Sequence, residues 1–189
     1  MKTAIAQHIQ DSIAVKQQLL KSFVPSIEEA AIKVSVCLKQ GGKLLFMGNG
    51  GSASDSQHLA AEFVGRYEKE RRALAAIALT TDTSILTAVG NDYGFEKIFE
   101  RQIEALGKKG DILFAISTSG NSKNVLRGVQ KAKVLGLYTI ALAGGTGGEL
   151  GSLADLALVI PSKKTSRIQE SHILIGHIIC ECVDELLTR

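Results

Sequence analysis

The sequence contains no tryptophan, only three cysteines among its 189 residues, and no long apolar run. No apolar segment approaches the ~20 residues that a membrane-spanning helix needs. The N-terminal residues are amphipathic and lack the apolar core and the cleavage site of a signal peptide. Cys37, Cys180 and Cys182 are odd in number and form no Cys-x-x-Cys motif, so we expect reduced thiols and a cytoplasmic protein.

Neither sign of charge dominates the sequence. The 22 lysines and arginines and the 19 aspartates and glutamates leave a net charge of +3, and bases alternate with acids, as in residues 68–72. There is no basic stripe interspersed with aromatic side chains, which argues against a nucleic-acid partner. The hydrophobic share of 45% is that of an ordinary globular protein. We therefore expect one domain over residues 1–189 that binds neither nucleic acid nor membrane.

Two nucleotide-binding motifs are missing as well. The glycine-rich segment at residues 47–55 lacks the Gly-x-Gly-x-x-Gly spacing of a dinucleotide fold, and it has no Gly-Lys-Ser/Thr of a P-loop. A nucleotide cofactor is therefore not indicated. The close glycines instead suit a sugar that lies against the backbone, with Asn49 and Ser52 available to its hydroxyl groups.

Short apolar segments alternate with helical patterns along the chain. Strands are predicted over residues 43–47, 74–79, 111–116, 138–143 and 156–160. Helices are predicted over residues 3–22, 25–40, 82–89, 94–107 and 122–135, from residue 52 and from residue 165, with a glycine-rich turn before the last strand. Strands that are apolar on both faces and separated by helices belong to a parallel sheet covered on both sides. The predicted fold class is α/β, a three-layer doubly wound sheet of five parallel strands with two N-terminal helices.

Three polar segments are expected as loops that converge on one crevice, because ligands of such sheets bind at the carboxyl ends of the strands. These segments are residues 48–54, 90–92 and 117–122. The last one leaves a strand and opens a helix, so free backbone N–H groups and the positive end of the helix dipole favour an anion. Its hydroxyl groups add donors, and Gly120 lets the backbone approach closely. The pattern suggests capture of a phosphate monoester without a lysine; an ordinary turn is the alternative.

Four polar side chains on two of the helices are candidate ligands or catalysts. His58 and Glu62 are four residues apart, which places them on one face of a helix. Gln169 and His177 lie on the last helix, roughly 12 Å apart along its axis. To meet one ligand, these two must lean toward each other, or a second subunit must contribute. Taken singly, such residues are more often structural than functional.

Taken together, the motifs resemble those of the sugar isomerase (SIS) domain family, and within it the sedoheptulose-7-phosphate isomerases, also called phosphoheptose isomerases. The resemblance covers nearly the whole chain. The motifs are residues 48–52, His58-x3-Glu62 followed by Gly65-Arg66-Tyr67, residues 90–92, residues 117–122, and Arg167-Ile168-Gln169-Glu170-x-His172-x4-His177. The resemblance implies a flavodoxin-like sheet and a homotetramer with active sites near subunit contacts, in which residues 1–40 form a helical extension that makes oligomer contacts.

The same resemblance implies the roles of individual residues. Substrate contacts fall on Asn49, Gly50, Gly51, Ser52, Glu62, Asn91, Asp92, Ser117, Thr118, Ser119, Ser122 and Gln169. The ligands of one zinc ion per subunit fall on His58, Glu62, Gln169 and His177. Nitrogen and oxygen donors suit Zn²⁺, although an amide is an unusual ligand. The catalytic acid/base pair falls on Glu62 and His177, with Glu62 assigned as the base and the reverse assignment as the alternative.

The implied reaction converts sedoheptulose 7-phosphate into D-glycero-D-manno-heptose 7-phosphate through an enediolate, the first step toward ADP-heptose and lipopolysaccharide. A rival reading comes from a non-catalytic, tetrameric branch of the family (DiaA-like) that binds the bacterial replication initiator. This chain shares residues 79–82 and 162–170 with that branch, and Ser166 stands where some heptose isomerases carry an aspartate. The branch lacks the carboxylate at position 62 and the imidazole at position 177. Both are present here, which favours the isomerase.

Overall fold

Five parallel strands form one sheet in the computed structural model, which describes residues 1–188. The strands are β1 (Leu44–Gly48), β2 (Ala76–Ala78), β3 (Ile112–Ser117), β4 (Tyr138–Gly144) and β5 (Leu156–Ile160). Their order is β2-β1-β3-β4-β5, and Gly48 at the end of β1 pairs with Ile116 near the end of β3. The predicted doubly wound α/β class with five parallel strands is confirmed.

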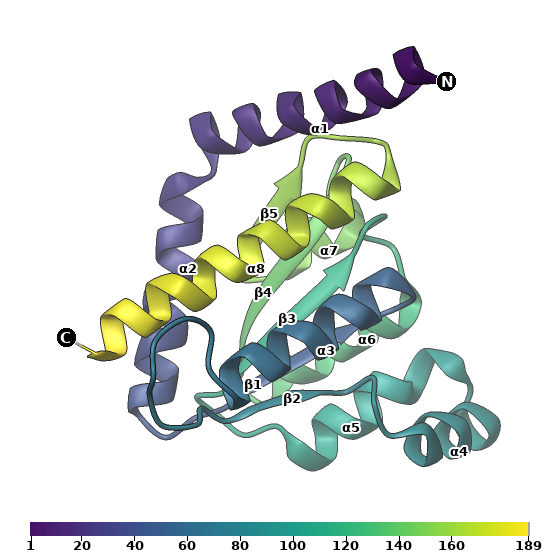
Figure 1. The fold of residues 1–189 in the computed structure, drawn as a ribbon. Helices are drawn as coiled ribbons and strands as arrows, with labels where there is room; N and C mark the ends of the chain where they lie inside the picture. Colours follow the sequence, from purple (N-terminus) through teal and green to yellow (C-terminus); the bar gives the residue numbers. More distant parts are fainter. Residues whose placement is uncertain (189) are drawn as a thin grey trace.

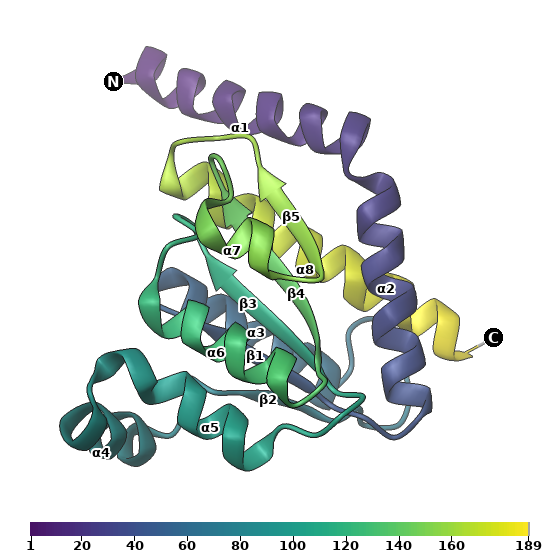
Figure 2. The ribbon, with the colours of Figure 1, turned by 180° about the vertical axis from the view of Figure 1, so that it is seen from behind.

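Helices cover both faces of this sheet (Figure 1). They are α1 (Lys2–Ser22), α2 (Val24–Lys39), α3 (Gly51–Val64), α4 (Thr83–Tyr93), the 3-10 helix η1 (Phe95–Lys97), α5 (Ile98–Leu106), α6 (Lys123–Val134), α7 (Gly148–Leu153) and α8 (Thr165–Thr188). Helices α2, α3 and α8 pack on one face, and α5, α6 and α7 pack on the other, which Figure 2 shows from behind.

The two cores follow from the alternation of side chains along each strand. Phe46 and Phe114 point to the α3 and α8 side, where their rings stack with centroids 4.8 Å apart. Met47 and Ala115, the next residues along, point to the other side and pack against α5 and α6. Because both faces of β1, β3 and β4 are buried, these strands are largely apolar on both sides, and their sequence pattern therefore predicts them.

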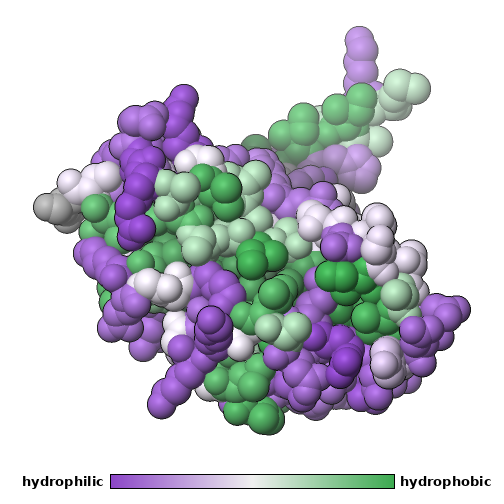
Figure 3. Space-filling model, turned by 90° about the horizontal axis from the view of Figure 1, so that it is seen from below, coloured by the Kyte–Doolittle hydropathy of each residue, from purple (hydrophilic) through white to green (hydrophobic). Residues whose placement is uncertain are grey.

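Helix α1 lies across the N-terminal part of α8 and is bonded to it by polar contacts. Ser12 donates a hydrogen bond of 2.8 Å to the Glu170 carboxylate. Away from this contact, Ile5, Ile9 and Ile13 are each about half exposed, at 53%, 57% and 49%. Figure 3 shows α1 projecting beyond the body of the molecule with hydrophobic residues along it. The chain therefore carries an apolar helix face that its own core does not cover.

Three predicted segments differ from the structure. Residues 90–92 are not a loop but the last turns of α4, which begins at the capping Asp82 carboxylate and ends before Gly94 at φ +91°. Strand β2 has three residues rather than six, because it is an edge strand and Leu74 bonds to Phe63 O in α3 instead of entering the sheet. The predicted glycine-rich turn contains the short helix α7.

Two further sequence observations have structural counterparts. The three cysteines are free, with Cys37 and Cys180 buried, as expected for reduced thiols. Burial raises the pKa of Cys180 to about 12, so this thiol stays protonated and unreactive. Within residues 1–188, no helix has the length and apolar character to cross a membrane.

Candidate active site

The glycine- and serine-rich loops meet where the strand order reverses, between β1 and β3. In this topology the loops after the two central strands diverge to opposite faces of the sheet and leave a crevice between them. One loop consists of Asn49 and Gly50, which connect β1 to α3, and the other consists of residues 118–122, which connect β3 to α6. The structure therefore brings two of the three predicted polar segments together.

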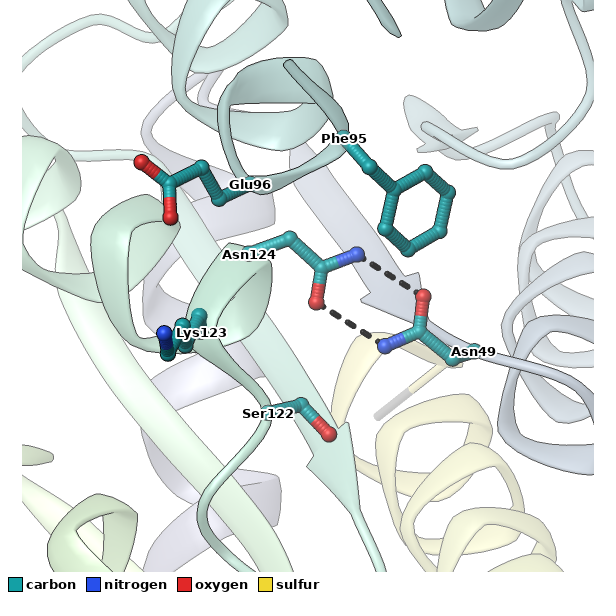
Figure 4. Close-up of a pocket in the computed structure, with 6 residues that line it drawn as sticks. All are labelled: Asn49, Phe95, Glu96, Ser122, Lys123 and Asn124. Carbon is teal, nitrogen blue, oxygen red and sulfur yellow. Dashed lines mark hydrogen bonds between the residues drawn. The ribbon is translucent and has the colours of Figure 1, made fainter.

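A reciprocal pair of side-chain amides bridges this crevice. Asn49 Nδ2 donates to Asn124 Oδ1 at 2.9 Å, and Asn124 Nδ2 donates to Asn49 Oδ1 at 2.8 Å (Figure 4). The pair forms part of the wall of a cavity of about 480 Å³. Its remaining lining residues are Phe95, Glu96, Ser122 and Lys123. Asn124 was missed in the sequence, although it lies only two residues beyond the Ser122 of the predicted loop.

The loop after β3 is held rigidly by its own backbone and hydroxyl groups. Ser117 Oγ and Ser122 Oγ are 3.0 Å apart and share a hydrogen bond. Gly120 has φ +67°, and a Cβ there would lie 1.9 Å from the carbonyl oxygen of Gly147, so only glycine fits. Asn121 accepts a hydrogen bond from the backbone N–H of Glu149 and thereby fixes the loop to α7. The loop is preorganised before any ligand arrives.

The hydroxyl groups of this loop face two cavities. Ser122 lines the first cavity beside the amide pair, whereas Thr118 and Ser119 line a second cavity of about 340 Å³ together with Lys163 at the entrance to α8. Ser117 is only 4% exposed, so its hydroxyl supports the loop from the buried side. The amino-terminal end of α6 borders the first cavity through Lys123 and Asn124 and favours an anion there.

His58, Glu62 and His177 form one cluster at the contact between α3 and α8. Their ligand atoms all lie within 4.8 Å of one another, and His58 Nε2 is 3.0 Å from Glu62 Oε1. The His58 and His177 rings meet edge to face with centroids 5.0 Å apart, and the Tyr67 ring lies 5.5 Å from that of His177. The donor set of two imidazoles and a carboxylate is one that could hold a divalent metal ion.

The two histidines of the cluster differ in exposure. The His58 side chain is 49% exposed, whereas His177 Nε2 is buried and has no hydrogen-bond partner among the described residues. A buried ring nitrogen without a partner is costly in a finished structure, and a bound ion or substrate group would satisfy it. The unpaired nitrogen of His177 is therefore available to a ligand at this cluster.

Gln169 and His177 lie on α8 and pack against different turns of α3. A Cβ on Gly51 would fall 2.3 Å from Gln169 Nε2, so the amide packs directly on the backbone at the start of α3. Helix α3 and helix α8 therefore run side by side, with Gln169 beside Gly51 and His177 beside His58. The contacts of the amide and of the imidazole within this chain are therefore with different turns of α3.

Asp55 is a further acidic group at this site, one turn before His58 on α3. Burial raises the pKa of its carboxyl to about 6, and the nearby His58 opposes part of that rise. Its Oδ2 is buried without a hydrogen-bond partner among the described residues. The sequence signal was available, since Asp55 and His58 are three residues apart on one helix face.

The sequence also predicts substrate contacts at Ser52, Asn91 and Asp92. Ser52 is 3% exposed and packs against Gly48, so it offers almost no surface to a ligand. Asn91 and Asp92 are exposed on α4, where Asn91 donates to the Asp92 carboxylate at 2.8 Å. Within the described chain, neither lines the two cavities at the loop after β3. Their expected place beside the other two loops is therefore not seen in a single chain.

The fold and this site define a class of protein, the doubly wound phosphosugar-binding domains, and the comparisons agree. Residues 7–144 match the family model described as "SIS domain". A phosphoheptose isomerase of Aquifex aeolicus is 52% identical over 99% of this chain and 98% of its own length. One of Helicobacter pylori is 54% identical over 93% and 94%.

Solved structures agree with the sequences. The structure of phosphoheptose isomerase from Neisseria gonorrhoeae superposes with a TM-score of 0.93 and 46% identity, covering 97% of this chain and 98% of that one. The chain belongs to the phosphoheptose isomerase family of SIS-domain proteins, and it is an isomerase.

Proposed function

We propose that this isomerase interconverts sedoheptulose 7-phosphate and D-glycero-D-manno-heptose 7-phosphate. The observation that carries the proposal is the placement of Glu62 and His177 on adjacent helices, with ligand atoms within 4.8 Å of one another. The names of the relatives support the same substrate. The initiator-binding branch is disfavoured because both groups that it lacks are present and are brought together.

Proton transfer between two carbons needs a base close to C1 and C2 of the sugar and an acid close to their oxygens. Glu62 removes the proton from C1 of the ketose, and the electron pair forms the C1–C2 double bond of an enediolate. His177 gives a proton to O2 and takes one from O1. Glu62 then returns its proton to C2, which leaves an aldehyde at C1 and a hydroxyl at C2.

The surroundings of Glu62 suit the role of a base. Its side chain is 23% exposed, so a substrate reaches it while most bulk water is excluded. One carboxylate oxygen engages His58, and the other remains for a proton. The neighbouring Arg71 holds the backbone carbonyl of Glu62 at 3.0 Å and fixes the end of α3 on which the carboxylate sits. The base therefore works from a rigid position.

We propose zinc as the ion of this cluster, held by His58, Glu62 and His177. The orphaned His177 nitrogen and the two-nitrogen, one-oxygen donor set fit this ion. Bound there, zinc would polarise sugar oxygens as a Lewis acid. Because a carboxylate bound to a metal is a poorer base, either Glu62 and His177 would leave the ion to move protons, or the ion would mainly orient the site. For Gln169 to be a fourth ligand, its amide must move away from Gly51.

Metal content tests this assignment independently of activity. We expect purified protein to bind zinc at one ion per chain, measured by elemental analysis and by a rise in melting temperature. His58→Ala should lower the affinity at least tenfold, the scale reported even for losing a residue behind a ligand. The exposed His8→Ala on α1 is the matched control and should bind zinc as the wild type does. Unchanged affinity in His58→Ala would refute the ligand set.

We propose that the chain forms a homotetramer through residues 1–40. The support is the apolar face of α1 at Ile5, Ile9 and Ile13, which repeats every four residues as a helix-packing seam does. Light scattering tests it, since Ile9→Glu with Ile13→Glu should yield a smaller species while Gln18→Glu, exposed on the opposite side of α1, should not. Free cysteines are consistent with a reducing compartment, so we propose a cytoplasmic location.

The reaction itself is tested by an NMR time course with sedoheptulose 7-phosphate in D₂O, before and after chelation. Appearance of the aldose phosphate carrying deuterium at C2 would support the isomerase and its enediolate. Loss of turnover on chelation would make the metal functional. If a folded, metal-loaded protein converts no ketose, the substrate assignment is wrong and the initiator-binding alternative returns.

A further inference from the structure

The hydrogen bonds of the Asn49–Asn124 amide pair determine which way each amide group is turned. An asparagine side chain can be turned over with little change in shape, so the position of its nitrogen and its oxygen must be fixed by its neighbours. For Asn49, the neighbour that bonds to both ends is Asn124. What fixes Asn49 therefore depends on what fixes Asn124.

A backbone group determines the orientation of Asn124. The N–H of Val125 donates to Asn124 Oδ1 at 3.0 Å, and a backbone N–H can only donate. The atom facing it must be the oxygen of the amide. Val125 is fully buried in the first turn of α6, where the N–H groups have no partner within the helix, so this bond cannot be exchanged for one to water.

The orientation of the Asn124 amide in turn determines the orientation of the Asn49 amide on the other side of the crevice. With Asn124 Oδ1 shared by Val125 and Asn49, the Asn49 atom that meets it must be the nitrogen, and the Asn49 oxygen must meet Asn124 Nδ2. Figure 4 shows the Asn49 nitrogen on the side of Ser122 and its oxygen on the side of Phe95. One N–H of Asn49 is used in the pair, and the second has no acceptor among the residues that the structure describes.

We propose that Asn124 is a positioning residue that makes Asn49 present an N–H donor, rather than a carbonyl oxygen, toward the Ser122 side of the cavity. The inference rests on the proposed function, because the ligand that benefits is a phosphorylated sugar whose oxygens accept hydrogen bonds. A reversed Asn49 would place an oxygen against those oxygens. Asn124 is only 3% exposed, so it acts through Asn49.

The Asn124 side chain also accepts a hydrogen bond from the first turn of α6, and this role must be separated from its contact with Asn49. Ser122, the residue that precedes α6, makes no capping bond, because its hydroxyl pairs with Ser117. A serine at position 124 would still place an acceptor near the Val125 N–H but would be too short to reach Asn49. Asn124→Ser and Asn124→Leu therefore form a matched pair: both remove the contact with Asn49, and only the second removes every acceptor for Val125.

Kinetics and crystal structures of these variants test the proposal. We expect both to raise KM for sedoheptulose 7-phosphate about tenfold, the scale of one hydrogen bond to a charged or strongly polar group, with kcat within about twofold of the wild type. Asn49→Ala should raise KM similarly, and Asn49→Ala combined with Asn124→Ser should be no worse than Asn49→Ala alone. Additive effects in the double variant would overturn the proposal.

Two further results would support or overturn the positioning role of Asn124. If only Asn124→Leu raises KM and also lowers the melting temperature, Asn124 serves α6 and not Asn49, and the proposal is wrong. Crystal structures give an answer that does not depend on catalysis: Asn49 should leave its place in Asn124→Ser and keep it in the wild type. An unmoved Asn49 overturns the positioning role, whereas a wild type without isomerase activity overturns the proposed function alone.

Discussion

His58 Nε2 and Glu62 Oε1 lie 3.0 Å apart, one turn from each other on α3. On an exposed helix such a pair would contribute only a few tenths of a kcal/mol. Here the pair faces His177 on α8, whose buried Nε2 has no partner among the described residues. A helix pair that is ordinary by itself thus becomes part of a three-residue site through the packing of a second helix.

Glu62→Gln should leave the protein folded and lower kcat about 10²-fold or more, the usual scale for removing a general base. The amide has the shape of the carboxylate but cannot accept the C1 proton. Turnover and melting temperature should be measured together, with Glu104→Gln on the surface of α5 as the control that leaves kcat unchanged. Wild-type turnover in Glu62→Gln would transfer the role of base to another group.

Most of the fold was predictable because its signals are local. Five apolar segments indicate the strands, three of them buried on both faces, and the helix over residues 25–40 has its buried stripe at Ile27, Ala30 and Val34. The errors occurred where tertiary contacts override local patterns. Residues 90–92 look like a turn, yet they lie inside α4, which continues to Tyr93 and packs against η1 and α5.

The site was only partly predictable for the same reason. His58 and Glu62 share a helix, so their spacing indicated a common face. Asn124 and Arg71 carried no such signal, because their partners are 75 and 113 residues away in the chain. The separation of Gln169 from His177 also required the structure, which shows each against a different turn of α3. Spacing reveals neighbours on one element, whereas packing between elements needs coordinates.

Arg71 and Asp184 form a buried ion pair with side chains only 5% and 2% exposed. Arg71 also donates to the backbone carbonyls of Glu62 and Phe63, so it joins the end of α3 to α8. Arg71→Met should lower the free energy of unfolding by about 3–5 kcal/mol, because Asp184 is left charged and buried.

Chemical denaturation measures this cost. Adding Asp184→Leu to Arg71→Met should recover part of the loss, since the unpaired charge is then removed. The matched control is Glu70→Gln, which breaks the exposed pair with Arg66 and should change stability by less than about 1 kcal/mol. A loss in Arg71→Met no larger than that of Glu70→Gln would show that the pair contributes little.

His172 should make stability depend on pH. Burial lowers the pKa of its imidazole from 6.5 to about 4, although the hydrogen bond with the Ala143 carbonyl opposes the fall. Above pH 6.5 the ring is neutral in both states, so its neutrality costs nothing. As the pH falls from 6.5 to 4 the unfolded chain takes up a proton that the folded chain does not, and about 3 kcal/mol of stability is lost.

His172→Gln isolates this effect, because the amide can still donate to Ala143 but cannot titrate. Free energies of unfolding should be measured for both proteins between pH 7 and pH 4. The wild type should fall more steeply than His172→Gln over this range, while the opposite contribution of Asp55 is common to both and cancels in the difference. Parallel curves would mean that His172 titrates normally in the folded protein.

Ser119→Ala should weaken substrate binding more than chemistry. Its hydroxyl is exposed at the second cavity and accepts only a 3.2 Å hydrogen bond from the Asn121 N–H, so it is free to donate to a phosphate oxygen. Loss of one such bond to a charged group should raise KM about tenfold at nearly constant kcat. Ser152→Ala on α7, whose hydroxyl bonds only to a local carbonyl, should change neither constant. A large fall in kcat with KM unchanged would place the phosphate elsewhere, and the cavity beside Ser122 would then be its site.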